Sequence, residues 1–348
     1  MEKNQGRGTY RKLQVTSILF GVFGLAAFLA SKFANGRLIV ILTVAGFVGF
    51  LVTASILAVK IKRFWKALGT LALDLLLAVL GAYLLMFFTL LFFQDTIADW
   101  TSTFFQPSIL SEEAAQEAAT GNVEALSFTA PDGVQLNGWL MDNAATDPSP
   151  LMIVFNGSGS ESSGLIPYMK NLDGWKVALV NYRGFGTSGG SPGRQKALDD
   201  ALLVFDALSS RADIDSGRIV SMGYSLGTGV AVHLSAKRPT AGTILVAPYD
   251  KLTLIGFKNS PAYAPFAGIM HPLFDNAALA PRITTPLLVL MGSLDTNVPP
   301  ELSKRLADLW GGDVKAIEYP GEDHGLLFHK NNSLKDIRDF LARLEPSK

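Results

Sequence analysis

The sequence contains no cysteine and only four histidines in 348 residues. Without cysteine there can be no disulfides, no thiolate metal sites and no cysteine nucleophile, but reducing and oxidising compartments both remain open. A net charge is also lacking, because 30 basic residues balance 30 acidic ones. Since nucleic-acid binding depends on a strongly basic surface, the composition predicts no nucleic-acid partner.

Hydrophobic residues make up 49% of the chain and are concentrated in its first hundred residues. Uncharged apolar segments at about 13–30, 38–59 and 75–93 each have the length of a transmembrane helix. We therefore expect residues 1–94 to form a membrane anchor of three transmembrane helices, followed by a connector at 95–122. Residues 123–348 have the composition of a separate globular domain, with a small cap at about 251–282. A cleaved signal peptide is the rival interpretation of the first segment.

The distribution of lysine and arginine predicts how this anchor is oriented. Positive residues in short loops are retained on the cytoplasmic side of a membrane. Four precede the first apolar segment and four follow the second, whereas the loop between those segments holds only Lys32 and Arg37. The pattern places the N-terminus in the cytoplasm and, after three crossings, the large domain outside it, which is the periplasm if the organism is bacterial.

From residue 123 onward, short apolar segments alternate with helical patterns, which predicts a mostly parallel sheet flanked by helices. Residues 125–130 and 134–141 flank a Pro-Asp-Gly turn and predict an antiparallel hairpin. Catalytic groups gather beyond the C-terminal ends of the strands in such a sheet. Further strands are expected at 151–155, 176–182, 218–222, 243–247, 286–291 and 315–319, and helices at 111–119, 197–208, 226–237 and 301–309.

A Gly-Tyr-Ser-Leu-Gly motif at residues 223–227 directly follows one predicted strand and precedes a predicted helix. This context forces the central serine into a sharp, exposed turn, and the two glycines relieve the crowding that results. The N-terminus of the following helix also favours developing negative charge. Ser225 is therefore the predicted nucleophile, and an ordinary glycine-rich turn is the alternative.

A serine hydroxyl needs a base within hydrogen-bond reach and a group that orients that base. His324 is the predicted base, because it lies in a flexible loop directly after the last strand. Asp295, which follows the strand at 286–291, is predicted to orient it, and Asp250, one strand earlier, is the alternative. The remaining histidines are assigned to helices or to the cap, with the last of them at the start of the final helix: His233, His271 and His329.

Acyl transfer also needs N–H donors directed at the oxyanion of the tetrahedral intermediate. The amide of Leu226, next to the nucleophile, is one predicted donor. The second is expected in residues 156–160, called the oxyanion loop here, with the amide of Ser158 favoured and that of Gly157 as the second choice. A flexible Gly/Ser turn without a catalytic role is the alternative for this loop.

Three further motifs carry a resemblance to a known family: NYRGFGTSGG at 181–190, FDN at 274–276 and GSLDTNVP at 292–299. Together with the chain order Ser, Asp, His, they make residues 123–344 resemble the α/β-hydrolase superfamily. Within it, the sequence is similar to the branch of serine aminopeptidase-like hydrolases, monoglyceride lipases and protein-depalmitoylase-like enzymes. The resemblance implies an α/β-hydrolase fold. One departure is Asn156-Gly157, where relatives carry His-Gly; because the donor is a backbone amide, we expect the oxyanion hole to remain intact.

These observations predict a membrane-anchored serine esterase that cleaves carboxylic esters or thioesters of small acyl, lipid or acylated substrates. The predicted chemistry requires no cofactor and no metal. A serine peptidase with the same triad is one alternative, and a catalytically silent, membrane-tethered binding module is another. The sequence makes no prediction about the oligomeric state.

Overall fold

The computed structural model describes residues 48–49, 52, 73–86, 88, 105–252, 273–329 and 332–344. The chain divides into two compact units, Met1–Phe92 and Phe93–Lys348. The second unit contains every predicted site residue.

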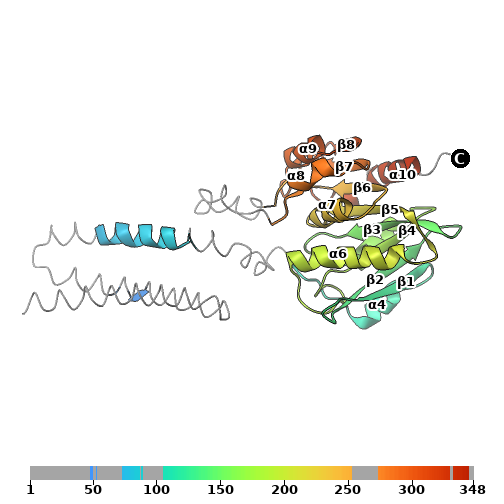
Figure 1. Cartoon of the computed structure of the whole chain (residues 1–348), viewed down its shortest axis with the longest axis horizontal. Coiled ribbons are helices and arrows are strands. Elements are labelled where there is room, and N and C mark those ends of the chain that lie inside the picture. The colour runs from blue at the N-terminus through green and yellow to red at the C-terminus, as the bar shows by residue number, and fades with distance from the viewer. Residues whose placement is uncertain are drawn as a thin grey trace, which may run out of the picture. The chain divides into compact units, whose positions relative to one another are not determined.

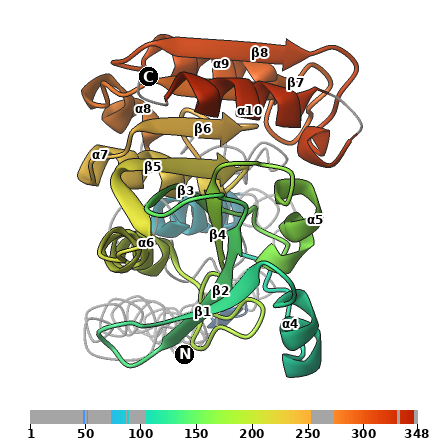
Figure 2. The same cartoon turned by 90° about the vertical axis from the view of Figure 1, so that its right-hand side faces the viewer.

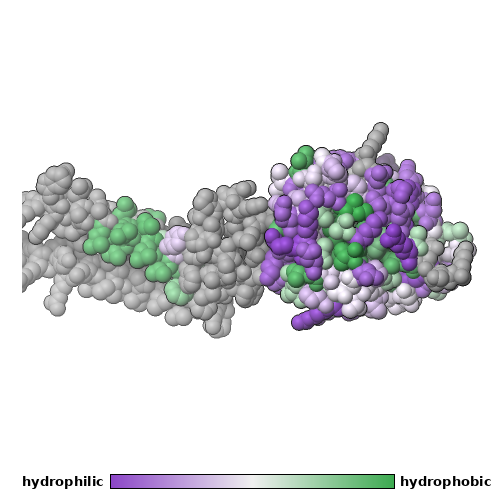
Figure 3. Space-filling model, turned by 90° about the horizontal axis from the view of Figure 1, so that it is seen from above, coloured by the Kyte–Doolittle hydropathy of each residue, from purple (hydrophilic) through white to green (hydrophobic). Residues whose placement is uncertain are grey.

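In the first unit, residues 73–86 form a helix (Figure 1), and the side of it that is visible in Figure 3 is mostly hydrophobic. Leu75 and Leu76 are among its exposed side chains. The predicted span at 13–30 and most of that at 38–59 lie outside the described residues. Among the helices that the structure describes, none combines the length and the apolar character needed to cross a membrane.

The second unit is built on an eight-stranded sheet with the strand order β1-β2-β4-β3-β5-β6-β7-β8 (Figure 2). Strand β2 pairs antiparallel with β1 and β4, and all other neighbours are parallel, so the predicted hairpin and the mostly parallel sheet are confirmed. The strands are β1 (Val123–Thr129), β2 (Gln135–Asp142), β3 (Ser149–Phe155), β4 (Lys176–Val180), β5 (Ile214–Tyr224), β6 (Gly242–Val246), β7 (Leu287–Gly292) and β8 (Val314–Tyr319).

Successive residues of a strand point to opposite faces of the sheet. Because both faces carry buried apolar side chains, helices cover both of them. Leu151 and Ile153 of β3 belong to one buried cluster that includes residues of α6, α7 and α9, whereas Met152 and Val154 belong to a second cluster that includes residues of α5 and α10. Two hydrophobic cores result, one on each face of the sheet, and Figure 2 shows the helices on the two sides of the strands. The helices are α4 (Glu112–Ala118), α5 (Ile166–Met169), α6 (Arg194–Ser209), α7 (Gly227–Lys237), α8 (Asn276–Leu279), α9 (Pro300–Asp308) and α10 (Ser333–Arg343), with 3-10 turns η3 (Ser162–Leu165), η5 (Ala280–Arg282) and η6 (Leu326–Phe328).

Several boundaries differ from the sequence-based prediction. Strand β5 begins at Ile214, four residues before the predicted start, since the Asp-Ser-Gly-Arg segment that follows Ile214 carries no strand pattern. His329 does not begin the last helix: it caps η6, and α10 starts at Ser333. Residues 273–282 of the predicted cap pack into the core through Phe274 and Ala280, whereas 253–272 lie outside the described residues.

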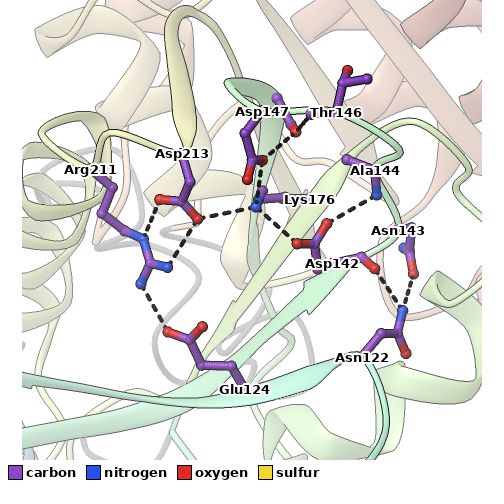
Figure 4. A network of polar contacts seen from close by, with 11 residues as sticks. Asn122, Glu124, Asp142, Asn143, Ala144, Thr146, Asp147, Lys176, Arg211 and Asp213 are labelled. Carbon is purple, nitrogen blue, oxygen red and sulfur yellow. Dashed lines mark hydrogen bonds and ion pairs between the residues drawn. The ribbon is translucent and has the colours of Figure 1, made fainter.

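A buried lysine joins the N-terminal ends of several strands, at the edge of the sheet opposite the predicted site (Figure 4). Lys176 opens β4 and is 2% exposed. Its ammonium group lies 2.9 Å from Asp142, 3.0 Å from Asp147 and 3.0 Å from Asp213. Burial alone would lower the pKa of Lys176, but hydrogen bonds to the three carboxylates raise it above its usual value. The cluster therefore ties the hairpin to the parallel part of the sheet through a permanently charged lysine.

Replacing Lys176 with methionine should lower the free energy of unfolding by about 2–4 kcal/mol at pH 7, because three carboxylates lose their shared counter-charge. Arg211 and then Lys176 hold the pKa of Asp213 below its usual range. The stabilisation by ionised Asp213 is fully present above the unfolded-state pKa of about 4 and decreases as the pH falls below it. The difference in unfolding free energy between the wild type and Lys176→Met should therefore be smaller at pH 3 than at pH 7. Urea unfolding at pH 7 and at pH 3 measures this difference. Lys170→Met, at an exposed lysine, is the control, and equal stabilities of the two variants would contradict the prediction.

Candidate active site

Ser225 lies at the sharp turn between β5 and α7, at the C-terminal edge of the sheet. Its φ of 51° is in the left-handed region that side chains rarely adopt. The turn is possible because glycines flank it. A Cβ on Gly223 would lie 2.4 Å from the carbonyl oxygen of Gly227, and one on Gly227 would lie 2.0 Å from that of Phe155. The strand, turn and helix expected around Ser225 are all present.

His324 lies between Ser225 and Asp295. Its Nε2 is 2.9 Å from Ser225 Oγ, and its Nδ1 is 2.8 Å from Asp295 Oδ2. The three side chains come from the loops after β5, β8 and β7, which meet at one edge of the sheet. An ionised carboxylate can only accept hydrogen bonds, so Nδ1 carries the proton and Nε2 is free to accept one from the serine hydroxyl.

Asp295 is itself fixed in place. It is 4% exposed, and its Oδ1 accepts hydrogen bonds from the amides of Asn297 (2.9 Å) and Val298 (2.8 Å). This leaves Oδ2 for the imidazole. The alternative acid, Asp250, is occupied elsewhere: Arg305 Nε donates to its Oδ2 at 2.8 Å, and the amide of Lys251 donates to its Oδ1. The contacts therefore favour Asp295 over Asp250 as the residue that orients His324.

The two candidate donors of the oxyanion loop, the amides of Gly157 and Ser158, differ in their hydrogen bonds. The amide of Gly157 donates to Asn156 Oδ1 at 2.8 Å and is thus already engaged. The amides of Ser158 and Leu226 donate to no acceptor within the described part of the chain. The contacts therefore leave the amides of Ser158 and Leu226 available to a ligand, whereas the amide of Gly157 is engaged.

Asn156, which stands where relatives carry histidine, folds this loop back on itself. Besides accepting from the Gly157 amide, its side chain donates from Nδ2 to the carbonyls of Ser160 (3.2 Å) and Glu161 (3.1 Å). It is 2% exposed, so these bonds are shielded from water. The substitution noted in the sequence thus supplies the loop with an internal brace.

Three buried tyrosines, which the sequence did not single out, support the site from behind. Each hydroxyl donates to a main-chain carbonyl of one functional segment: Tyr182 to Asn156 (2.9 Å), Tyr224 to His324 (3.0 Å) and Tyr249 to Leu226 (3.0 Å). Burial raises the pKa of Tyr224 to about 12 and also raises the pKa of Tyr182 and of Tyr249. All three phenols therefore remain protonated donors at neutral pH.

Tyr224 makes more contacts at the site than the other two. Its ring centroid lies 5.5 Å from that of His324, at an interplanar angle of 32°, and 5.5 Å from that of Phe328 in an edge-to-face arrangement. A Cβ on Gly157 would lie 3.3 Å from the same ring. One side chain thus borders the nucleophile, the histidine loop and the oxyanion loop.

The sequence of the second unit is similar to those of known proteins. Residues 146–279 match the family described as serine aminopeptidase, S33. The uncharacterized protein Rv2307c of Mycobacterium tuberculosis is 31% identical over 215 residues, a match covering 61% of this chain and 76% of that protein. The chain belongs to the S33 family of α/β hydrolases. Human protein ABHD12B is 29% identical to this hydrolase over 228 residues, covering 58% of this chain and 62% of its own.

Solved structures confirm the fold of this hydrolase. The esterase Pf2001 of Pyrococcus furiosus superposes with a TM-score of 0.54 at 18% sequence identity, covering 69% of this chain and 98% of its own. The structure of DcsB superposes with a TM-score of 0.53 at 17% identity, covering 64% of this chain and 97% of its own. The predicted α/β-hydrolase fold of the second unit is therefore confirmed.

Among the described residues, no group of three or more His, Asp or Glu side chains could hold a metal ion.

Proposed function

We propose that this α/β hydrolase is a serine hydrolase that cleaves carboxylic esters or thioesters. The observation that carries the proposal is the continuous chain of contacts from Ser225 through His324 to the buried Asp295. A polarised serine hydroxyl, a correctly protonated imidazole and a fixed carboxylate are the requirements of nucleophilic acyl transfer.

The proposed reaction has two steps. Ser225 Oγ attacks the acyl carbon while His324 Nε2 accepts its proton, and the amides of Leu226 and Ser158 bind the oxyanion. His324 then gives the proton to the departing alcohol or thiol, which leaves an acyl-enzyme. In the second step water attacks the acyl-enzyme with the same base, releasing the acid and restoring the serine. Each step uses groups from loops that the sheet holds at one edge.

The proposal predicts covalent labelling of Ser225 by a fluorophosphonate and an initial burst of p-nitrophenol from p-nitrophenyl esters, because both reactions acylate or phosphonylate the same oxygen. The measurement uses the full chain solubilised in detergent, with acetyl and palmitoyl esters and thioesters compared. A folded protein that is neither labelled nor active would move the conclusion to a silent binding module.

A peptidase activity of the same triad is the second candidate, favoured by the S33 family to which the chain belongs. An aminopeptidase must also recognise a free α-amine. Hydrolysis of aminoacyl p-nitroanilides at rates comparable with those of esters would favour the peptidase, and their resistance would favour the esterase.

We also propose that residues 1–94 hold the hydrolase at a membrane, with the N-terminus in the cytoplasm and the catalytic unit outside it. The exposed leucines of the helix at 73–86 support this location, because a surface of this kind gains free energy on leaving water. Substrates would then be lipids or acylated molecules near the membrane. Resistance to alkaline carbonate extraction tests whether the protein is integral to the membrane. Digestion of the catalytic unit by a protease added to one side only tests its orientation.

A further inference from the structure

The residues that precede α4 are built into the site. Residues 105–110, called the strap here, run beside the loop that follows β4. Ile109 forms a parallel bridge with Gly186, the amide of Gly186 donates to the carbonyl of Ser108 at 2.8 Å, and the amide of Leu110 donates to the carbonyl of Gly186 at 3.2 Å. The strap is therefore held by a short ladder, although its sequence has no strand pattern.

Phe105 anchors the other end of the strap. It is 3% exposed and lies edge-to-face against Tyr182 (5.6 Å between centroids) and Phe185 (6.4 Å). Tyr182 is the residue whose hydroxyl holds the carbonyl of Asn156. The anchor thus packs directly on a support of the oxyanion loop.

Between the anchor and the ladder, the strap reaches the oxyanion loop itself. The amide of Gln106 donates to the carbonyl of Ser158 at 2.7 Å. A Cβ on Gly159 would lie 3.7 Å from Gln106 Oε1, so the strap also borders the next residue. Ser158 is the residue whose own amide is the proposed oxyanion donor. A bond to its carbonyl restrains the peptide plane that follows this donor.

We infer that the strap is a positioning element of the active site and that the main-chain N–H of Gln106 holds Ser158 where its amide can serve the oxyanion. The inference rests on the proposed function. Asn156 braces the loop from within and Tyr182 holds its first carbonyl, but only Gln106 holds its middle among the contacts of the described residues. Donors aimed at the oxyanion are effective because they are held in place before the reaction.

The experiment compares Gln106→Pro with Gln106→Ala in the full chain. Both variants lose the Gln106 side chain, but only proline removes the N–H. Pro107 already follows, and neither residue is helical, so the exchange does not interrupt a helix. Relative to Gln106→Ala, we expect the proline variant to lose about 10–100-fold in kcat on p-nitrophenyl acetate, with KM unchanged within about two-fold.

The inhibition constant of a transition-state mimic is a measurement that a purely structural role of the strap would leave unchanged. Butaneboronic acid forms a tetrahedral adduct with the serine oxygen and places an oxygen in the oxyanion hole, so its inhibition constant should rise by the same factor as kcat falls. Equal kcat values and equal inhibition constants in the two variants would overturn the inference.

A second variant decides the matter if Gln106→Pro does not fold. Phe105→Leu retains every N–H of the strap and a buried apolar side chain but loses the ring contacts with Tyr182. A lower kcat at constant KM, with weaker boronate inhibition, supports the inference, whereas wild-type constants overturn it. If the wild type itself shows no Ser225-dependent activity, the proposed function fails; an active wild type with insensitive strap variants refutes the strap alone.

Discussion

Replacing Ser225 with alanine should reduce kcat for ester hydrolysis by about 10⁵–10⁶-fold and abolish fluorophosphonate labelling. The hydroxyl is the only proposed acyl acceptor, and without it His324 has no proton to remove. Residual hydrolysis would come from water bound near the oxyanion donors. Steady-state kinetics with p-nitrophenyl acetate measure the loss, and labelling with a fluorescent fluorophosphonate reports it independently. An alanine variant that retains even one per cent of the wild-type rate would contradict Ser225 as the nucleophile.

The glycine variant at the same position separates chemistry from folding. Ser225 has a φ of 51°, which costs a residue with a side chain about 1 kcal/mol or more and a glycine almost nothing. Ser225→Gly should therefore be as inactive as Ser225→Ala and yet more resistant to urea than the alanine variant by about 1 kcal/mol. Equal stabilities would mean that the turn relaxes in solution.

Replacing Asp295 with asparagine should reduce kcat by about 10⁴-fold with little change in KM. The amides of Asn297 and Val298 select an oxygen at the position of Oδ1, so the new NH₂ group would face His324 Nδ1. That nitrogen would then have to accept, and the proton would move to Nε2. An imidazole in this tautomer cannot accept the proton of Ser225.

Asp250→Asn is the matched control, since it makes the same chemical change at the rival acid. Asp250 interacts with Arg305 rather than with His324, and we expect its amide variant to stay within about three-fold of the wild-type kcat. Stopped assays of both variants at saturating ester decide between the two acids. A severe loss in Asp250→Asn with a mild one in Asp295→Asn would reverse the assignment.

Much of the fold could be predicted because its strands are apolar segments between turn residues. The hairpin around the Pro-Asp-Gly turn and the parallel strands from β3 onward follow from that pattern. The start of β5 could not be predicted, because Ile214 pairs with Ser149 of β3 and the polar residues 215–218 lie in the irregularity that separates this pair from Leu151 and Ile219. The ladder between the strap and Gly186 is likewise a tertiary contact without a local signal.

The candidate site likewise contains residues that the sequence predicts and residues that it does not. Ser225, His324 and Asp295 could be singled out because each occupies a loop directly after a strand, and parallel strands bring such loops together. The tyrosine supports could not, since a hydroxyl that donates to a carbonyl 26 or 100 residues away leaves no trace in local sequence. Tyr182 and Tyr224 both lie inside motifs that were recognised, which is the only signal that could have drawn attention to them.

The three tyrosine supports determine how the frame of the active site responds to the acidity of its surroundings. A frame held by carboxylates or imidazoles would loosen whenever the acidity of its compartment changed. Here the braces are phenols whose pKa values burial raises, to about 12 for Tyr224, and their acceptors are peptide carbonyls that do not titrate. These three hydrogen bonds therefore persist across the physiological range of acidity.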